Sequence, residues 1–363
     1  SSKMYSQRFK KITKSISYWI RKIICRISEM NFNTSLSYLL RFSCLLALVV
    51  IVLGAYVRLS DAGLGCPDWP GCYGKLIVPE GSNSQIEQMN KAYPERPFEK
   101  DKAWKEMLHR YLASALGLTI LILAILSWSK KQFSSIRLSS SILLALVIFQ
   151  GLLGMWTVTL LLKPIVVVFH LLGGLTILSL LYWLMLQTQS AGRFFVSKGN
   201  AELRPVVAIA LIVLFCQISL GGWTSSNYAA LACPDFPTCQ GTWWPKMNFF
   251  EGFILWRGLG IDYEGGTLDG AARTAIHMTH RIGAVITTIV IAYVGLRSIF
   301  TNTRSLKLTG TIVLILLTIQ ILLGIANVKL SLPIFAAVAH NGVAALLLLS
   351  LVTLLYQCMD HRK

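Results

Sequence analysis

The sequence predicts an all-α polytopic membrane protein whose eight transmembrane helices form two pseudo-symmetric four-helix bundles. Three observations lead to this fold class: an apolar composition, eight long apolar runs, and an internal repeat. Apolar residues make up 54% of the 363 positions and charged residues only 14%, whereas an ordinary soluble domain has roughly 25% charged residues. This composition argues against a water-soluble enzyme.

Eight apolar runs are each long enough to cross a hydrocarbon core of about 30 Å, which takes roughly 20 helical residues. Glycine inside these runs is compatible with membrane helices, where small residues allow close packing. Because eight is an even number, we expect both chain ends on one side of the membrane. The predicted spans are 36–57, 105–128, 138–160, 165–187, 205–224, 274–296, 308–329 and 333–357.

The segment 1–35, which precedes the first span, is basic and carries isoleucine and tryptophan at helical spacing. This pattern predicts an amphipathic helix that lies in the headgroup plane of the membrane. A mitochondrial targeting segment has a similar composition and is the alternative. The segment lacks the long uncharged core of a secretory signal.

Basic residues gather on the side of the membrane that holds both chain ends. The formal net charge is +18, from 34 Lys and Arg against 16 Asp and Glu, and 20 of the basic residues but only three of the acids fall on that side. Such an excess marks the cytoplasmic or matrix face and attracts anionic lipids, so nucleic acid is not needed as a partner. We expect a bacterial inner membrane protein with cytoplasmic termini, or alternatively a mitochondrial inner membrane protein.

The two halves of the chain repeat one design. The stretch 54–74 reads GAYVRLSDAGLGCPDWPGCYG and matches 221–241, GGWTSSNYAALACPDFPTCQG, at an offset of 167 residues. Later landmarks repeat as well, namely Gln150 and Gly154 as Gln320 and Gly324. Each half holds four spans and therefore keeps the same orientation, as in parallel repeats about an axis along the membrane normal. The predicted units are one bundle over 36–190 and a second over 191–363.

Five of the six histidines fall near the outer ends of even-numbered spans and thus share one depth. They are His109, His170, His277, His280 and His340. A single buried histidine is commonly a hydrogen-bonded structural residue, but ionisable residues repeated at one membrane depth point to function. Two imidazoles from facing helices can hold a heme iron from both sides, whereas zinc needs three or four ligands. We therefore pair His109 with His170 and His280 with His340 as heme ligands.

Charged residues flank these ligands. Arg110 and Arg281 each follow a ligand, where a guanidinium could hold a heme propionate or, alternatively, a lipid headgroup phosphate. Glu106 lies one helical turn before His109, and its repeat mate is His277. A carboxylate at that position could handle protons at the porphyrin edge, with a simple membrane-boundary carboxylate as the alternative.

Two long outer loops, 58–104 and 225–273, have no predicted secondary structure and each contain one Cys-x5-Cys pair. The pairs are Cys66 with Cys72 and Cys233 with Cys239. In an oxidising compartment each pair can close a disulfide that stabilises its loop by roughly 2–3 kcal/mol. Alternatively, a pair could exchange electrons with the nearby heme site.

Taken together, the Cys66–Cys72 loop, the Glu106-x-x-His109-Arg110 motif, His170, the run 276–281 (IHMTHR) and His340 closely resemble the heme A synthase family. The similarity extends over about 36–357. It implies an enzyme that oxidises the C8 methyl of heme O to the formyl group of heme A by two successive hydroxylations.

The same resemblance assigns the ligands and partners. It implies a resident heme b on His280 and His340, with Arg281 and His277 beside it, and a site for heme O lined by His109, His170 and Arg110. Glu106 is then the candidate catalytic residue. Heme O synthase, cytochrome oxidase assembly factors and an electron donor or acceptor of unassigned identity are the implied partners. The alternatives are a diheme b-type membrane electron carrier, which would not need Glu106, and a membrane thiol-disulfide oxidoreductase.

Overall fold

The computed structural model describes residues 34–188 and 202–359. The amphipathic helix predicted for 1–35 falls almost entirely outside these residues.

The described residues contain eight helices that are long and apolar enough to cross a membrane, which confirms the eight predicted spans. Several extend beyond the predicted hydrophobic core at their outer ends, because a helix continues after it leaves the hydrocarbon. The helices are Thr34–Leu59, α3 (Lys100–Ser129), Phe133–Thr159, α5 (Pro164–Thr188), α7 (Leu203–Ser226), α9 (Gly270–Ile299), α10 (Arg304–Lys329) and α11 (Ile334–Gln357). The third of them, Phe133–Thr159, consists of the end of the 3-10 helix η1 (Lys131–Ile136) and of α4 (Arg137–Thr159).

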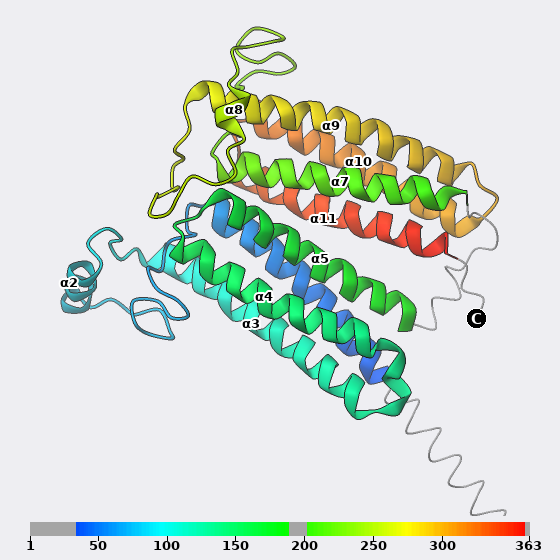
Figure 1. The fold of residues 1–363 in the computed structure, drawn as a ribbon, viewed down its shortest axis with the longest axis horizontal. Helices are drawn as coiled ribbons and strands as arrows, with labels where there is room; N and C mark the ends of the chain where they lie inside the picture. Colours follow the sequence, from blue (N-terminus) through cyan, green and yellow to red (C-terminus); the bar gives the residue numbers. More distant parts are fainter. Residues whose placement is uncertain (1–33, 189–201, 360–363) are drawn as a thin grey trace, which may run out of the picture.

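The helices form the two predicted four-helix bundles (Figure 1). The first holds Thr34–Leu59, α3, α4 and α5, and the second holds α7, α9, α10 and α11. The bundles meet where α5 packs against α7 and α11. At that seam the hydroxyls of Tyr182 and Thr353 lie 2.9 Å apart, and Leu181 and Leu351 belong to one buried apolar cluster. The two halves therefore share a single core.

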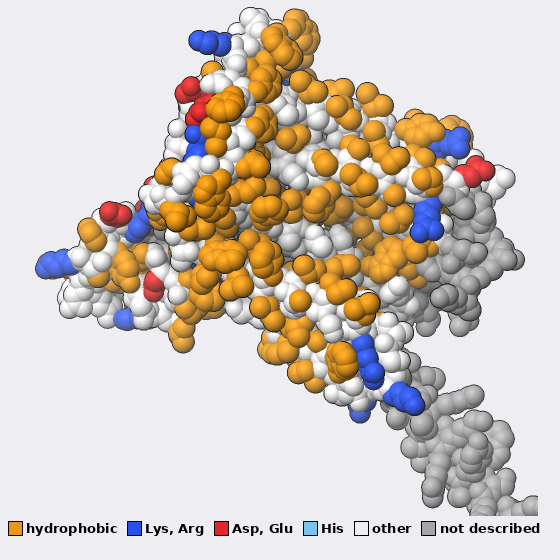
Figure 2. All heavy atoms as spheres, in the orientation of Figure 1, with side chains coloured by type: hydrophobic (Ala, Val, Ile, Leu, Met, Phe, Trp, Pro, Cys, Tyr) orange, Lys and Arg blue, Asp and Glu red, His pale blue; other side chains and the backbone are white. Residues whose placement is uncertain are grey.

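The surface divides into an apolar band and charged ends (Figure 2). Apolar side chains cover the flanks of the helices, whereas most Lys, Arg, Asp and Glu side chains visible in this view lie at the two ends. This arrangement suits helices whose sides face lipid and whose ends face water. The chain is a multi-pass membrane protein.

The outer loops contain structure that the sequence did not predict. A helix, α2 (Asn83–Ala92), packs its Met89 into a small apolar cluster with Tyr73. A shorter helix, α8 (Phe249–Gly252), precedes α9. The isolated α2 segment has no long apolar face, so its hydrophobic pattern is too weak to mark it as a helix in the sequence.

The repeat extends to backbone conformation. The turn before α5 places Leu161 and Leu162 at φ values of 50° and 59°, and the equivalent turn before α11 places Ser331 and Leu332 at 55° and 62°. Non-glycine residues rarely adopt this left-handed region. Its recurrence at matched positions shows that both bundles orient their fourth helix by the same turn.

Candidate functional site

Each outer loop is closed by a disulfide, Cys66–Cys72 in the first half and Cys233–Cys239 in the second. The four cysteines are fully buried. Within the second loop, the Asp235 carboxylate accepts hydrogen bonds from the backbone N–H groups of Gln240 and Gly241. Asp68 makes the equivalent contacts in the first loop, to Tyr73 and Gly74. Each disulfide therefore lies in a small, internally bonded turn.

Glu106 and Arg110 fasten the first loop to α3. One Glu106 oxygen accepts a hydrogen bond from the backbone N–H of Cys66 at 2.9 Å, and the other forms an ion pair with Arg110. Arg110 also donates to the carbonyl oxygens of Asp68 at 3.0 Å and Gly71 at 2.6 Å. Glu106 is 5% exposed, so a carboxylate is held directly between the disulfide and the helix that carries His109.

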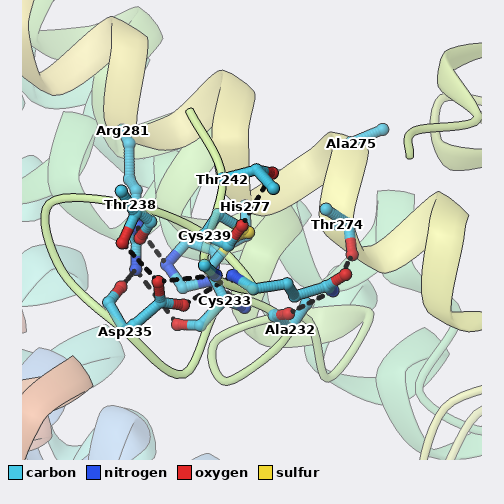
Figure 3. Close-up of a disulfide and its surroundings, with 12 residues drawn as sticks. Ala232, Cys233, Asp235, Thr238, Cys239, Thr242, Thr274, Ala275, His277 and Arg281 are labelled. Atoms are coloured by element: carbon cyan, nitrogen blue, oxygen red, sulfur yellow. Dashed lines mark hydrogen bonds between the residues drawn. A yellow bond between two sulfur atoms is a disulfide. The ribbon is translucent and has the colours of Figure 1, made fainter. Parts of the chain in front are cut away.

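The second half repeats this arrangement with an imidazole in place of the carboxylate (Figure 3). His277 Nδ1 accepts a hydrogen bond from the backbone N–H of Cys233 at 3.2 Å, and its Nε2 lies 3.3 Å from Nε of Arg281. Arg281 donates to the carbonyl oxygens of Asp235 and Thr238 at 2.8 and 2.9 Å. An imidazole therefore makes the contact with the second loop that a carboxylate makes with the first.

These contacts give Arg110 and Arg281 partners that the sequence did not predict. Both guanidinium groups bind carbonyl oxygens of the disulfide loops. Their contact with heme propionates stays a prediction. So does a redox role for the cysteines, although Glu106 brings one disulfide within a hydrogen bond of α3.

Each of the four paired histidines packs on a glycine of the preceding span. A β-carbon built on the glycine would approach Cε1 of the histidine within 2.9–3.3 Å, which is tighter than ordinary contact. The pairs are Gly54 with His109, Gly154 with His170, Gly221 with His280, and Gly324 with His340. Small residues here let the imidazoles lie against the neighbouring backbone, so the four rings are placed by one repeated device.

Glutamines one turn before three of these glycines contact the same histidines. Gln217 Nε2 lies 3.1 Å from His280 Nδ1, and Gln320 Nε2 lies 3.2 Å from His340 Nε2. Gln150 donates to the backbone carbonyl of His170. The first span has Val50 at the equivalent position, so His109 has no glutamine partner. The repeated Gln-x3-Gly pattern is visible in the sequence, but the contacts of these glutamines with the histidines were not predicted from it.

The first pair has the geometry expected of two imidazoles that share one metal. The ring centroids of His109 and His170 lie 6.4 Å apart, and two rings each bonded to a metal at about 2 Å would be separated by roughly this distance. Nδ1 of His109, His170 and His340 is buried and has no hydrogen-bond partner among the described residues.

Within 34–188 and 202–359, no group of three or more His, Cys, Asp or Glu is placed to hold a metal ion. A zinc site needs three or four protein ligands. Paired imidazoles in an apolar bundle fit a heme iron, since the porphyrin supplies the remaining ligands.

The chain resembles known proteins over most of its length. Residues 37–352 match the family described as cytochrome oxidase assembly protein. The chain is 46% identical over 321 residues to the heme A synthase of Shewanella oneidensis, covering 88% of this chain and 96% of that protein. Heme A synthases of Halalkalibacterium halodurans and Nitrosospira multiformis are 24% and 26% identical, over 84% of this chain and 90% and 88% of theirs.

Proposed function

Because the chain belongs to the heme A synthase family of cytochrome oxidase assembly proteins, we propose that it oxidises the C8 methyl of heme O to the formyl group of heme A. The observation that carries this proposal is a set of four histidines, each packed on a glycine. Each bundle holds two of them, near the outer ends of its second and fourth helices. Two such pairs allow one half to hold a cofactor and the other a substrate.

The second half is the better candidate for the resident heme b, on His280 and His340. Both imidazoles have a glutamine neighbour, Gln217 or Gln320, and such neighbours restrict the orientation of the ring. In the first half, His109 has no such neighbour. We therefore assign heme O, which has to enter and leave, to His109 and His170.

Bound heme supplies the redox chemistry, which side chains alone lack. His109 on α3 and His170 on α5, whose ring centroids lie 6.4 Å apart, would hold the porphyrin in the first bundle. Each oxidation of the methyl carbon requires proton transfer at the reacting site, and Glu106 is the nearest carboxylate to His109 on α3. One of its oxygens accepts a proton while the Cys66 N–H and Arg110 fix the orientation of the carboxylate.

The orientation and partners complete the proposal. The relatives named above are bacterial proteins, and the basic excess on the side of the termini favours a bacterial inner membrane with external disulfide loops. Heme O then comes from a heme O synthase, and the product goes to assembly of the terminal oxidase.

Heme extraction tests the activity. The chain is expressed with a heme O-producing enzyme, and the extracted hemes are separated. A synthase yields heme A and its hydroxylated intermediate. Unchanged heme O would instead favour a diheme electron carrier. Heme A formation that survives Cys66→Ser and Cys72→Ser would exclude a mechanism that depends on this disulfide.

A further inference from the structure

Lys163 is a buried cation at the outer end of the first bundle. It directly precedes α5, is 1% exposed, and is the largest of the fully buried side chains among the described residues. Its Nζ donates to the carbonyl oxygen of Gly258 and lies 3.3 Å from the centroid of the Trp256 ring. Both partners belong to the loop between α8 and α9 and therefore to the second half.

The partners of Lys163 are neutral. No carboxylate of the described residues forms an ion pair with it. Burial lowers the pKa of Lys163 from its ordinary value, and a buried charge without a counter-charge is costly. A cation–π contact and one carbonyl offset part of this cost, but an ammonium group has three donors. The structure thus keeps an incompletely satisfied cation at this place.

The position of Lys163 relates it to His170. Its carbonyl oxygen accepts the helical hydrogen bond of Val167 N–H at 3.1 Å, so Lys163 continues the register of α5. Seven residues at the helical rise correspond to about 10 Å along the axis. Lys163 therefore stands about two turns outward of His170, at the N-terminal end of α5.

The second half has no equivalent cation. The residue at the repeat position, 170 residues later, is Pro333. Several other basic side chains at the outer end of the first half have carboxylate partners: Arg58 with Asp61, Arg96 with Asp262 and Glu264, Lys102 with Glu99, Lys105 with Asp101, and Arg110 with Glu106. Lys163 is thus a cation specific to the half that we assign to the substrate.

We propose that Lys163 binds a propionate carboxylate of the substrate heme, and that Gly258 and Trp256 hold its ammonium group when no substrate is bound. The assignment rests on the proposed function, since it takes heme O to be the ligand of His109 and His170. A carboxylate would replace a carbonyl and a ring face with a charge-assisted hydrogen bond, which is stronger than a neutral one. Binding would also remove the uncompensated charge.

Binding of heme O and of heme O dimethyl ester to the purified full chain, with its resident heme in place, tests this role. Lys163→Gln should weaken heme O binding by about tenfold or more, and it should leave ester binding unchanged because the ester carries no charge. Lys163→Arg should retain most of the heme O affinity. Lys246→Gln, which alters an exposed lysine of the second outer loop, should change neither affinity.

Equal weakening of acid and ester binding, or no weakening of either, would overturn the assignment. If Lys163→Gln loses the resident heme spectrum, Trp256→Ala provides an independent test. This variant removes the aromatic ring that competes with the substrate carboxylate for the Lys163 ammonium group. The affinity for heme O relative to that for its ester should then stay the same or rise, and a fall would contradict the proposal. A wild-type chain that binds heme O but forms no heme A would refute the proposed function, while the acid-to-ester ratio would still report on Lys163.

Discussion

Replacing Glu106 by glutamine should stop formation of heme A while both heme sites stay filled. The substitution keeps the size of the side chain and one hydrogen-bond acceptor for the Cys66 N–H, which now lies 2.9 Å from a carboxylate oxygen. It removes the charge and the ion pair with Arg110. General acid–base catalysis contributes about 10²–10⁴ in rate, so we expect conversion to fall at least 100-fold and heme O or the alcohol to accumulate.

The second half supplies a control for this prediction. His277 occupies the position of Glu106 and still accepts a hydrogen bond from its disulfide loop, through Cys233 N–H. Glu106→His should therefore keep the first loop in place without providing a carboxylate. The assay is the fraction of heme O, alcohol and heme A extracted at matched protein level, together with the resident heme spectrum. Wild-type heme A from either variant would show that Glu106 only holds the loop.

Three further predictions test the histidines, the glycines and the loop. His280→Ala should remove the resident heme b spectrum, whereas His109→Ala should keep most of it and abolish heme A; equal loss of heme b from both would refute the division between halves. Gly54→Ala places a β-carbon 2.9 Å from Cε1 of His109 and should weaken heme O binding roughly tenfold through overpacking, whereas Gly151→Ala, with no atom within 4 Å of the new carbon, should not. The hydrogen bond from Thr238, followed by two backbone N–H groups, lowers the pKa of Asp235 to about 2 from 3.8. Its stabilising effect on the loop is therefore complete above about pH 4 and is lost as the pH falls toward 2, so the protection of the loop amides, measured relative to the exchange of an unfolded peptide at the same pH, should fall in that window. An Asp235→Asn loop that shows the same acid response would contradict this cause.

Several features of the fold and site follow from local sequence. Each span is a continuous apolar run whose helical state is imposed by lipid, so composition alone locates it. The matched loops around Cys66 and Cys233 predict the two bundles because the offset repeats. Histidines at equal distances from the outer helix ends, such as His109 and His280, share a depth by simple counting along a helix.

Other features depend on contacts between distant segments. Lys163 and Gly258 are 95 positions apart and belong to different halves, and no sequence motif links the two residues. Likewise, Glu106 reaches the backbone of Cys66, and a backbone N–H has no signature in the sequence. Such partners are set by the way that two bundles and their loops dock, which one-dimensional periodicity does not encode.

We attribute the proposed difference in function between the two halves to the positions at which their repeated sequences differ. Two copies of one bundle would bind two hemes alike, so any division between cofactor and substrate has to come from positions where the halves differ. Three such positions surround the first pair of histidines: Glu106 replaces an imidazole, Val50 replaces a glutamine, and Lys163 replaces a proline. In our proposal, the first would act as a proton acceptor, the second leaves His109 without the glutamine contact of the second half, and the third would offer a charge to the polar edge of a ligand. Each change would be of little use to a permanently bound heme, but together they suit a heme that enters, reacts and leaves.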